Sequence, residues 1–394
     1  MKCSLRPSNT LIRLQARAGK VKPLALTPGN RNVTPVAIII ALKKDLTMHL
    51  LAALVTLSLF CQQAAVHGAE TKAKELLKLR VGLASSPVPP LPNSVNWLAK
   101  DLGFYQREGL EVELIELQGT PLAVAAMISG DIDVGNIATS EAIRLSAAKV
   151  QSLRAIHSPD ARLYFLVAAR DEIKSAQELH GKSFAVARLG SVDHTLSMAA
   201  LKGLGVNTAN LTVLAMGVPS IRAQALVAGR VDATTMSVGT WATIQREAGV
   251  KVLIDQNVFF ENATVVEKVN AATAKVIEEK SEQLRRFTAA IIKTSRHFAD
   301  NQEAWVNAIT KRRPKLDRKD AANLWTGFKT AWAVNGLMNL EQYKKTAEFN
   351  YQTAAFEKIP KIDVHEWTDT RFVDDVLREI GVNQKADPLG RTLR

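Results

Sequence analysis

Three polar residues that follow one predicted strand have the chemistry needed to hold a small anion. Arg188, Ser191 and His194 lie on the turn between a strand expected at residues 183–188 and the helix that follows it. The start of a helix attracts anions through its free backbone N–H groups, and a guanidinium adds a charge-assisted hydrogen bond to a sulfonate or carboxylate. The stretch therefore predicts a contact site for an acidic group. Ordinary helix capping by Ser191 or Asp193, with Arg188 in solvent, is the structural alternative.

Small hydrogen-bonding residues also follow the other predicted strands. In open α/β sheets ligands bind at the carboxyl ends of the strands, where the loops lie. In the first half of the chain these loops are residues 85–93, 118–121 and 136–140. We therefore expect further ligand contacts from Ser85, Thr120, Asn136, Thr139, Ser140 and, in the second half, Ser237. For Thr139 and Ser140, capping of the next helix is again the alternative.

The stretch at residues 127–141 shows how the chain is expected to build such a loop. Gly130 can take the left-handed conformation that ends a helix, and a short buried strand is expected just after it, at residues 132–135. The same order recurs at residues 226–237, around Gly229. The repetition predicts two lobes of similar construction with a cleft between them.

Strands and helices alternate through both halves of the chain. Strands are expected at residues 79–84, 111–117, 132–135, 163–169, 183–188, 211–216, 231–236 and 252–254. This alternation is typical of α/β domains with a mostly parallel sheet, and the helical apolar period after Ser281 predicts a helical C-terminal part. We expect lobe 1 at residues 79–166, lobe 2 at 167–257, and a return to lobe 1 with the C-terminal helices at 258–394. The chain is expected to cross between lobes at 163–169 and to cross back around 259–262.

The charge of the chain is concentrated at its start. The chain has 394 residues, 47% of them hydrophobic, which is enough for two ordinary domains with cores of their own. The net charge is +13, but residues 1–47 carry nine Lys and Arg against Asp45 alone. Because no Arg-rich strip with interleaved aromatic residues remains elsewhere, we expect no nucleic-acid partner.

Residues 1–69 are expected to be a leader that ends in a cleaved secretory signal. Lys43 and Lys44 precede an apolar run at residues 50–60, and small residues follow as far as residue 69. The apolar core of about 11 residues is too short for a comfortable membrane span. A secretory signal beginning near residue 42 would look normal. Residues 1–41 are therefore interpreted as a start assigned too far upstream, and the mature protein as exported.

The expected mature chain lacks cysteine and shows no enzyme or metal-site motif. The two cysteines of the sequence, Cys3 and Cys61, both fall in the leader, which excludes cysteine catalysis, a disulfide and a thiolate metal site in the mature protein. Asp131 and Asp133 lie too close together at a helix end to work as an acid and base pair, and no two histidines have helical metal spacing. We expect no catalytic residue, no metal and no cofactor.

Several short runs carry a family resemblance. They are LAKDLGFY at residues 98–105, EGLEV at 108–112, SGDIDVG at 129–135, LHGK at 179–182 and GRVDA at 229–233. Together they resemble the periplasmic solute-binding proteins of nitrate/sulfonate/taurine-type ABC importers, a family that includes thiamine-pyrimidine-precursor-like binders. The resemblance covers roughly residues 79–300. It implies a bilobed, type 2 periplasmic-binding-protein fold, with two α/β lobes joined by two crossing strands and the ligand held between them.

The same resemblance implies a function. The protein would capture a small anionic or polar organic solute, such as a sulfonate, nitrate or a taurine-like molecule, and deliver it to an ABC permease in the inner membrane. Its expected partners are that solute and the permease, and it is expected to be a periplasmic monomer. One alternative is an enzyme on the same fold, similar to the pyrimidine-precursor synthases or sulfinate desulfinases, which rely on cysteine-containing motifs. Another is the ligand-sensing domain of a receptor.

Overall fold

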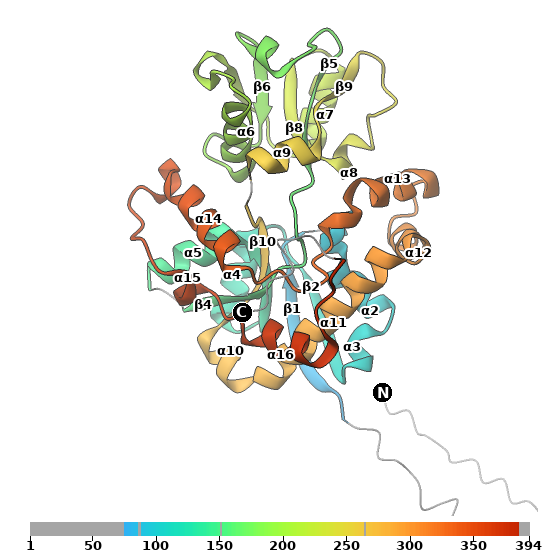
Figure 1. Ribbon diagram of the computed structural model, residues 1–394, viewed down its shortest axis with the longest axis vertical. Coiled ribbons are helices and arrows are strands. Elements are labelled where there is room, and N and C mark those ends of the chain that lie inside the picture. Colours follow the sequence, from blue (N-terminus) through green and yellow to red (C-terminus); the bar gives the residue numbers. More distant parts are fainter. Residues whose placement is uncertain (1–74, 86–87, 150–151, 264, 386–394) are drawn as a thin grey trace, which may run out of the picture. The chain divides into compact units, whose positions relative to one another are not determined.

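The chain forms two α/β lobes, each built around a five-stranded sheet (Figure 1). The computed structural model describes residues 75–85, 88–149, 152–263 and 265–385, so the leader expected at residues 1–69 lies outside the described residues. None of the helices in the described part is long and apolar enough to cross a membrane.

The two sheets have the same strand order. In the first sheet the order is β2-β1-β3-β10-β4, with β1 at Leu77–Leu83, β2 at Leu110–Glu116, β3 at Val134–Ala138, β4 at Leu153–His157 and β10 at Lys268–Thr273. In the second it is β7-β6-β8-β5-β9, with β5 at Phe165–Arg170, β6 at Ser183–Val186, β7 at Thr212–Ala215, β8 at Ala233–Ser237 and β9 at Val250–Ile254. The fourth strand of each sheet runs antiparallel to both its neighbours. The sheets are therefore mixed rather than mostly parallel, because that strand enters from the other lobe.

Both passages between the lobes differ from the expected positions. The chain crosses through residues 158–164, between β4 and β5, and returns through residues 265–267, between α9 (Gln256–Asn262) and β10. The strand expected to cross, at residues 163–169, instead pairs within the second sheet as β5. The expected return at 259–262 is part of α9, because its two phenylalanines are buried in the core of the second lobe.

Helices cover both faces of each sheet. In the first lobe they are α2 (Val95–Asp101), α3 (Phe104–Arg107), α4 (Thr120–Ser129), α5 (Thr139–Ala147), α10 (Ala274–Glu279) and α11 (Ser281–Asp300). In the second they are α6 (Val192–Gly203), α7 (Pro219–Val227), α8 (Val238–Trp241) and α9. In the first lobe, α2, α3 and α11 pack on one face of the sheet, and α4 and α5 on the other (Figure 1).

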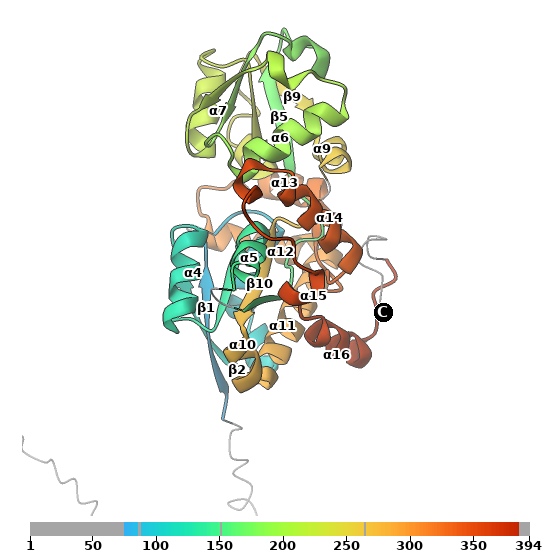
Figure 2. The same cartoon turned by 90° about the vertical axis from the view of Figure 1, so that its left-hand side faces the viewer.

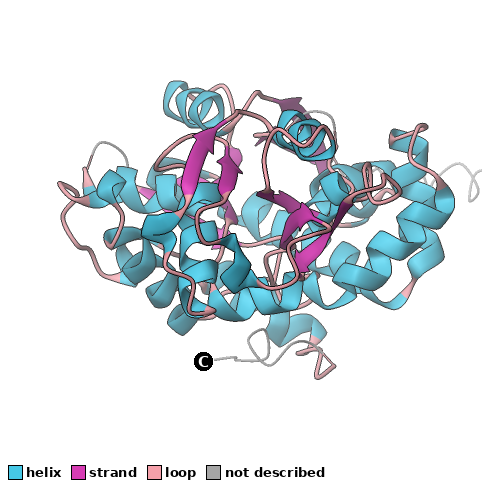
Figure 3. Cartoon of the chain, turned by 90° about the horizontal axis from the view of Figure 1, so that it is seen from above, coloured by secondary structure: helices cyan, strands magenta, loops and turns pink. Residues whose placement is uncertain are grey.

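The C-terminal part is helical, as expected. It comprises α12 (Gln302–Arg312), α13 (Arg318–Phe328), α14 (Leu340–Tyr351), α15 (Val364–Trp367) and α16 (Arg371–Ile380). Figure 2 shows α13 close to the second lobe, where Arg246 forms an ion pair with Asp320 at 2.7 Å and Gln256 donates to the carbonyl of Gly327 at 3.2 Å. Seen from above, helices enclose the strands (Figure 3). Short 3-10 turns lie at Pro92–Ser94, Ala176–Leu179, Thr208–Asn210, Lys329–Ala331 and Ala354–Phe356.

The repeated sequence stretch closes the two lobes in the same way. Gly130 and Gly229 take the left-handed conformation after α4 and α7, with φ of 80° and 67°. Three residues further on, Asp133 accepts a backbone N–H of β1 at 2.9 Å and Asp232 accepts a backbone N–H of β6 at 2.8 Å. Asp133 therefore joins the start of β3 to β1, and Asp232 joins the start of β8 to β6. This hydrogen bond is the structural role of the repeated stretch.

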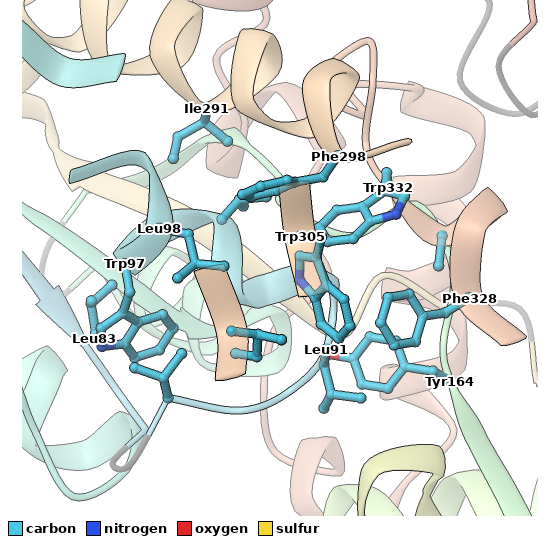
Figure 4. Packing of buried hydrophobic residues seen from close by; sticks show 14 of the residues in the cluster. Leu83, Leu91, Trp97, Leu98, Tyr164, Ile291, Phe298, Trp305, Phe328 and Trp332 are labelled. Atoms are coloured by element: carbon cyan, nitrogen blue, oxygen red, sulfur yellow. The ribbon is translucent and has the colours of Figure 1, made fainter. Parts of the chain in front are cut away.

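An aromatic cluster joins the C-terminal helices to the loop after β1. Trp305, Phe328 and Trp332 contact one another with ring centroids 5.1 to 6.1 Å apart. Figure 4 shows Leu91 and Tyr164 beside this cluster, and both belong to the same buried core. Residues from the β1 loop and the first crossing are therefore held by helices far along the chain.

Two hydrogen bonds fix that loop further. The indole Nε1 of Trp305 donates to Ser94 Oγ at 3.1 Å, and Arg313 Nη1 donates to the carbonyl of Val88 at 3.0 Å. The proline-rich loop after β1 thus has a defined course in its described residues, although no regular secondary structure precedes Pro92 within it.

Candidate functional site

A cavity of about 500 Å³ lies where the two lobes meet the crossing segments. The first lobe contributes Ser85, Pro89, Leu91 and Asn93 from the loop after β1, and the second contributes the loop after β6, the start of α6 and the end of β8. The crossings contribute Tyr164 from one segment and Glu267 and Lys268 from the other. A cavity of this size is typical of sites for small organic molecules.

Four of the nine residues expected to contact ligand line this cavity: Ser85, Arg188, Ser191 and Ser237. Arg188 is exposed, and its guanidinium has no partner among the described residues. The Ser191 hydroxyl lies 2.5 Å from the carbonyl of Arg188 and 2.5 Å from Asp193 Oδ1, so it already has acceptors within its own loop. Ser237 accepts the backbone N–H of Thr240 at 3.2 Å and caps α8.

The other five expected residues do not line the cavity: Thr120, Asn136, Thr139, Ser140 and His194. Thr120 Oγ1 accepts the N–H of Ala138 at 3.1 Å, and His194 Nδ1 accepts the N–H of Gly190 at 2.9 Å. Thr139 and Ser140 form the first turn of α5, and the buried Thr139 hydroxyl has no partner in the described part of the chain. The Thr120 and His194 side chains therefore hold their own loops in place instead of facing the cavity.

Asn136 belongs to a closed ring of four buried or nearly buried amides. The strand expected at residues 132–135 is observed at Val134–Ala138, because Asp133 is used to fasten β1, and Asn136 therefore lies inside the sheet. Around the ring, Asn93 donates to Asn136 at 3.1 Å, Asn136 to Asn270 at 2.9 Å, Asn270 to Asn96 at 3.0 Å, and Asn96 to Asn93 at 2.9 Å. We call this set the asparagine ring. It links the 3-10 turn at Pro92–Ser94, α2, β3 and β10, and Asn93 also lines the cavity.

One pair of opposite charges in the cavity wall, Arg222 and Asp193, forms an ion pair within the protein. Arg222 is only 2% exposed, and its Nη2 lies 3.2 Å from Asp193 Oδ2. The same guanidinium donates to Thr234 Oγ1 at 3.2 Å and to the carbonyl of Thr235 at 3.1 Å, while Asp193 also accepts the N–H of Ala187 at 2.8 Å. Burial lowers the pKa of Arg222, and the Asp193 carboxylate opposes that shift. This pair organises the wall and leaves little capacity for a ligand.

Glu267 and Lys268 present a second pair of charges to the cavity, and these interact at longer range without a direct ion pair. Neither side chain has a hydrogen-bond or ion-pair partner among the described residues. Burial raises the pKa of Glu267, with Lys268 opposing, and burial lowers the pKa of Lys268, with Glu267 opposing. Sequence reasoning missed both because it ended the second crossing before them. Two adjacent charges within the apolar and small-residue run at 265–273 were the available signal.

Asp160 on the first crossing extends this group of charges. Burial and the nearby Glu267 raise the pKa of Asp160, and Tyr164 donates a hydrogen bond to its Oδ2 at 3.3 Å.

In the described part of the chain, no group of three or more His, Cys, Asp or Glu is arranged to hold a metal ion. The cavity is therefore a charged and polar recess with apolar side walls.

The family model described as NMT1/THI5 like matches residues 95–304, which include most of both lobes and both crossings. The chain belongs to the NMT1/THI5-like family. A protein of Brucella abortus that is named a binding protein is 27% identical over 240 residues, which are 60% of this chain and 71% of the relative. The expected family resemblance is confirmed.

Solved structures confirm the fold of this NMT1/THI5-like chain. A periplasmic sulfonate-binding protein, SsuA, from Methylobacillus flagellatus superposes with a TM-score of 0.64 at 17% identity, covering 82% of this chain and 100% of that one. The periplasmic nitrate-binding protein NrtA from Synechocystis superposes with a TM-score of 0.59 at 10% identity, covering 78% and 90%. The bilobed periplasmic-binding-protein fold is thereby established.

Proposed function

We propose that the chain is the substrate-binding component of an ABC importer and holds a small anionic or polar organic solute between its lobes. The observation that carries this proposal is the interlobe cavity, which both lobes and both crossing segments line. Arg188 and Lys268 face it without partners among the described residues, and α6 begins at its wall. Cations and the start of a helix are the groups that bind oxyanions.

The similar proteins support the same role. SsuA and NrtA are named for sulfonate and nitrate, two oxyanions, and both are named as periplasmic. By analogy, this chain would be exported to the periplasm through its leader and would deliver its solute, as a monomer, to a permease in the inner membrane. Binding would favour closure of the lobes, since a ligand that contacts both stabilises the closed form.

We further propose that the site binds without catalysis. The enzyme alternative requires a cysteine-containing motif, and the two cysteines of the chain, Cys3 and Cys61, are both in the expected leader. The residues that line the cavity include no cysteine. Measurement of turnover for each compound that binds tests this point, and a chemical change in any of them would favour the enzyme.

A thermal-shift screen tests the proposed function. The panel is alkanesulfonates, taurine, nitrate, bicarbonate, aromatic acids and pyrimidines, each added to the mature protein. A compound that binds only the folded state at 100 times its Kd adds about 2.7 kcal/mol of stability and raises the melting temperature. We expect at least one acidic or polar member to do so, and a panel without any shift would contradict the proposal.

Reversal of the charge at Arg188 then tests whether a compound found in the screen binds in the interlobe cavity. Arg188→Glu should weaken an anionic hit by more than about tenfold, or roughly 1.4 kcal/mol, in isothermal titration calorimetry. The matched control is Arg230→Glu, an exposed arginine of the same lobe that does not line the cavity. Equal effects of the two substitutions would remove the Arg188 loop from the site.

A further inference from the structure

A second recess, of about 450 Å³, lies in the first lobe beside the start of β4, and we call it the β4 recess. β4 runs from here to the first crossing, and β10 comes from the second crossing and ends here, with Thr273 paired to Leu153. Figures 1 and 2 show the neighbouring α10 and α16 at the end of the first lobe that faces away from the second. The β4 recess shares no lining residue with the interlobe cavity.

Arg154 brings a positive charge without a counter-charge to the β4 recess. Its guanidinium forms no hydrogen bond or ion pair with any described residue, and its Nε is buried. A buried donor without an acceptor is destabilising, and more so when the group is charged. An acceptor that comes from outside the chain would remove this deficit.

Arg371 is the second arginine of the recess and is held in position by its neighbours. Its Nε and Nη2 donate to the two carboxylate oxygens of Asp369 at 2.9 Å and 2.6 Å. The backbone N–H of Asp369 donates to the carbonyl of Ala155 at 2.8 Å, which ties this group to the residue after Arg154. Nη1 of Arg371 has no partner among the described residues, so this oriented guanidinium still has donors to offer.

The start of α11 adds a further favourable group. Ser281 lines the recess and is the first residue of this 20-residue helix, and no side chain caps the helix. Free N–H groups at the start of a helix attract anions. Glu278 is the acid among the lining residues, but it is exposed and forms no ion pair with either arginine. Because Asp369 offsets part of the charge of Arg371, the net attraction comes mainly from Arg154.

We propose that the β4 recess binds a small dianionic oxyanion, phosphate or sulfate, at a site separate from the solute site between the lobes. Arg154 Nε and Arg371 Nη1 donate to its oxygens, and the hydroxyl of Ser281 adds a third donor. Guanidinium groups suit this role because their planar set of donors matches oxyanion geometry. The bound anion joins β4, α11 and α16, so it stabilises the first lobe at the ends of the strands that lead to and from the crossings.

Calorimetric titration of the mature protein with inorganic phosphate, and separately with sulfate, tests the proposal in chloride buffer of matched ionic strength. We expect at least one of the two anions to bind with a Kd below about 1 mM. Arg154→Gln should weaken it by at least about tenfold, and Arg371→Gln should weaken it as well. Arg378→Gln, at an exposed position further along α16 that does not line the recess, is the matched control and should leave the Kd unchanged.

Glu278→Gln gives a change in the opposite direction. It removes the carboxylate that opposes the anion, so binding of phosphate or sulfate should become tighter. A Kd that is the same in Glu278→Gln and in Arg154→Gln as in the wild type would overturn the inference. The melting temperature of each variant without anion verifies folding, and Arg371→Gln serves as the second test if Arg154→Gln is unstable.

The cavity variant Arg188→Glu separates the two sites. Each titration is repeated with it, and an anion held in the β4 recess should bind as it does to the wild type. Binding that is lost in Arg188→Glu and kept in Arg154→Gln would place the anion between the lobes, which overturns this inference and supports the proposed function. If neither anion binds, the inference is wrong and the proposed function stands.

Discussion

His157 shows how strongly one buried side chain can depend on pH without touching the cavity. Its Nε2 lies 2.7 Å from the amide nitrogen of Asn270, which must donate, and its Nδ1 lies 2.9 Å from the Thr288 hydroxyl. Burial lowers the pKa of His157 to about 3, so the folded protein holds it neutral. The asparagine ring therefore relies on an uncharged histidine beside it.

This arrangement predicts a loss of stability in acid. Between pH 6.5 and about 3 the unfolded chain takes up a proton at His157 that the folded chain does not. The free energy of unfolding therefore decreases as the pH is lowered through this range. The fall from this group is about 1.4 kcal/mol per pH unit. His157→Gln removes the group. In urea unfolding from pH 7 to 4.5, the stability advantage of the wild type over the variant should shrink by about 2.5 kcal/mol, and parallel curves would contradict it.

At the scale of elements, local patterns predicted well and long-range pairings did not. Gly130 and Gly229 could be found because a left-handed helix end is a local property of glycine, and the two α/β lobes follow from that repeated unit. The register of β3 could not be predicted, because it depends on Asp133 fastening a strand some 50 residues earlier. Asn136 was therefore expected in the cleft and is found within the sheet.

The same limit applies to the candidate site. The loop around Arg188 and Ser191 was found from its own turn, whereas Glu267 and Lys268 reach the cavity only through the second crossing. Arg222 was missed because its position within a helix gave no sign that Asp193, from another helix, would meet it. Local sequence is therefore enough to predict which residues lie at the end of a strand. It is not enough to predict which residues a crossing segment places beside them.

The aspartate that precedes β3, Asp133, gives a prediction at the scale of elements. Asp133 is 3% exposed and lies 2.9 Å from both Arg80 Nη2 and Lys280 Nζ. Asp133→Ala should lower the free energy of unfolding by about 3 kcal/mol, because it leaves two cations and a backbone N–H of β1 without their acceptor. The control is Asp131→Ala, an exposed position two residues earlier, with an expected effect within about 0.5 kcal/mol. Urea unfolding measures both, and similar values would contradict the fastening role.

At the scale of the whole molecule, the fold places three unlike parts at one cavity. The C-terminal aromatic cluster holds the proline-rich loop through Trp305 and Leu91, and the pair of Arg222 and Asp193 organises the α6 loop. The second crossing brings Glu267 and Lys268. Each part belongs to a different segment of sequence, and all three line the same recess. A solute that contacts all of them would link lobe closure to recognition.

A crystal structure of the mature protein with the tightest compound from the thermal-shift panel tests this account most directly. The account predicts ligand density in the interlobe cavity, with an acidic or polar group of the ligand within hydrogen-bond distance of Lys268 or Arg188. Ligand bound outside this cavity, for example in the recess lined by Arg80, Asp133 and Lys280, would contradict it.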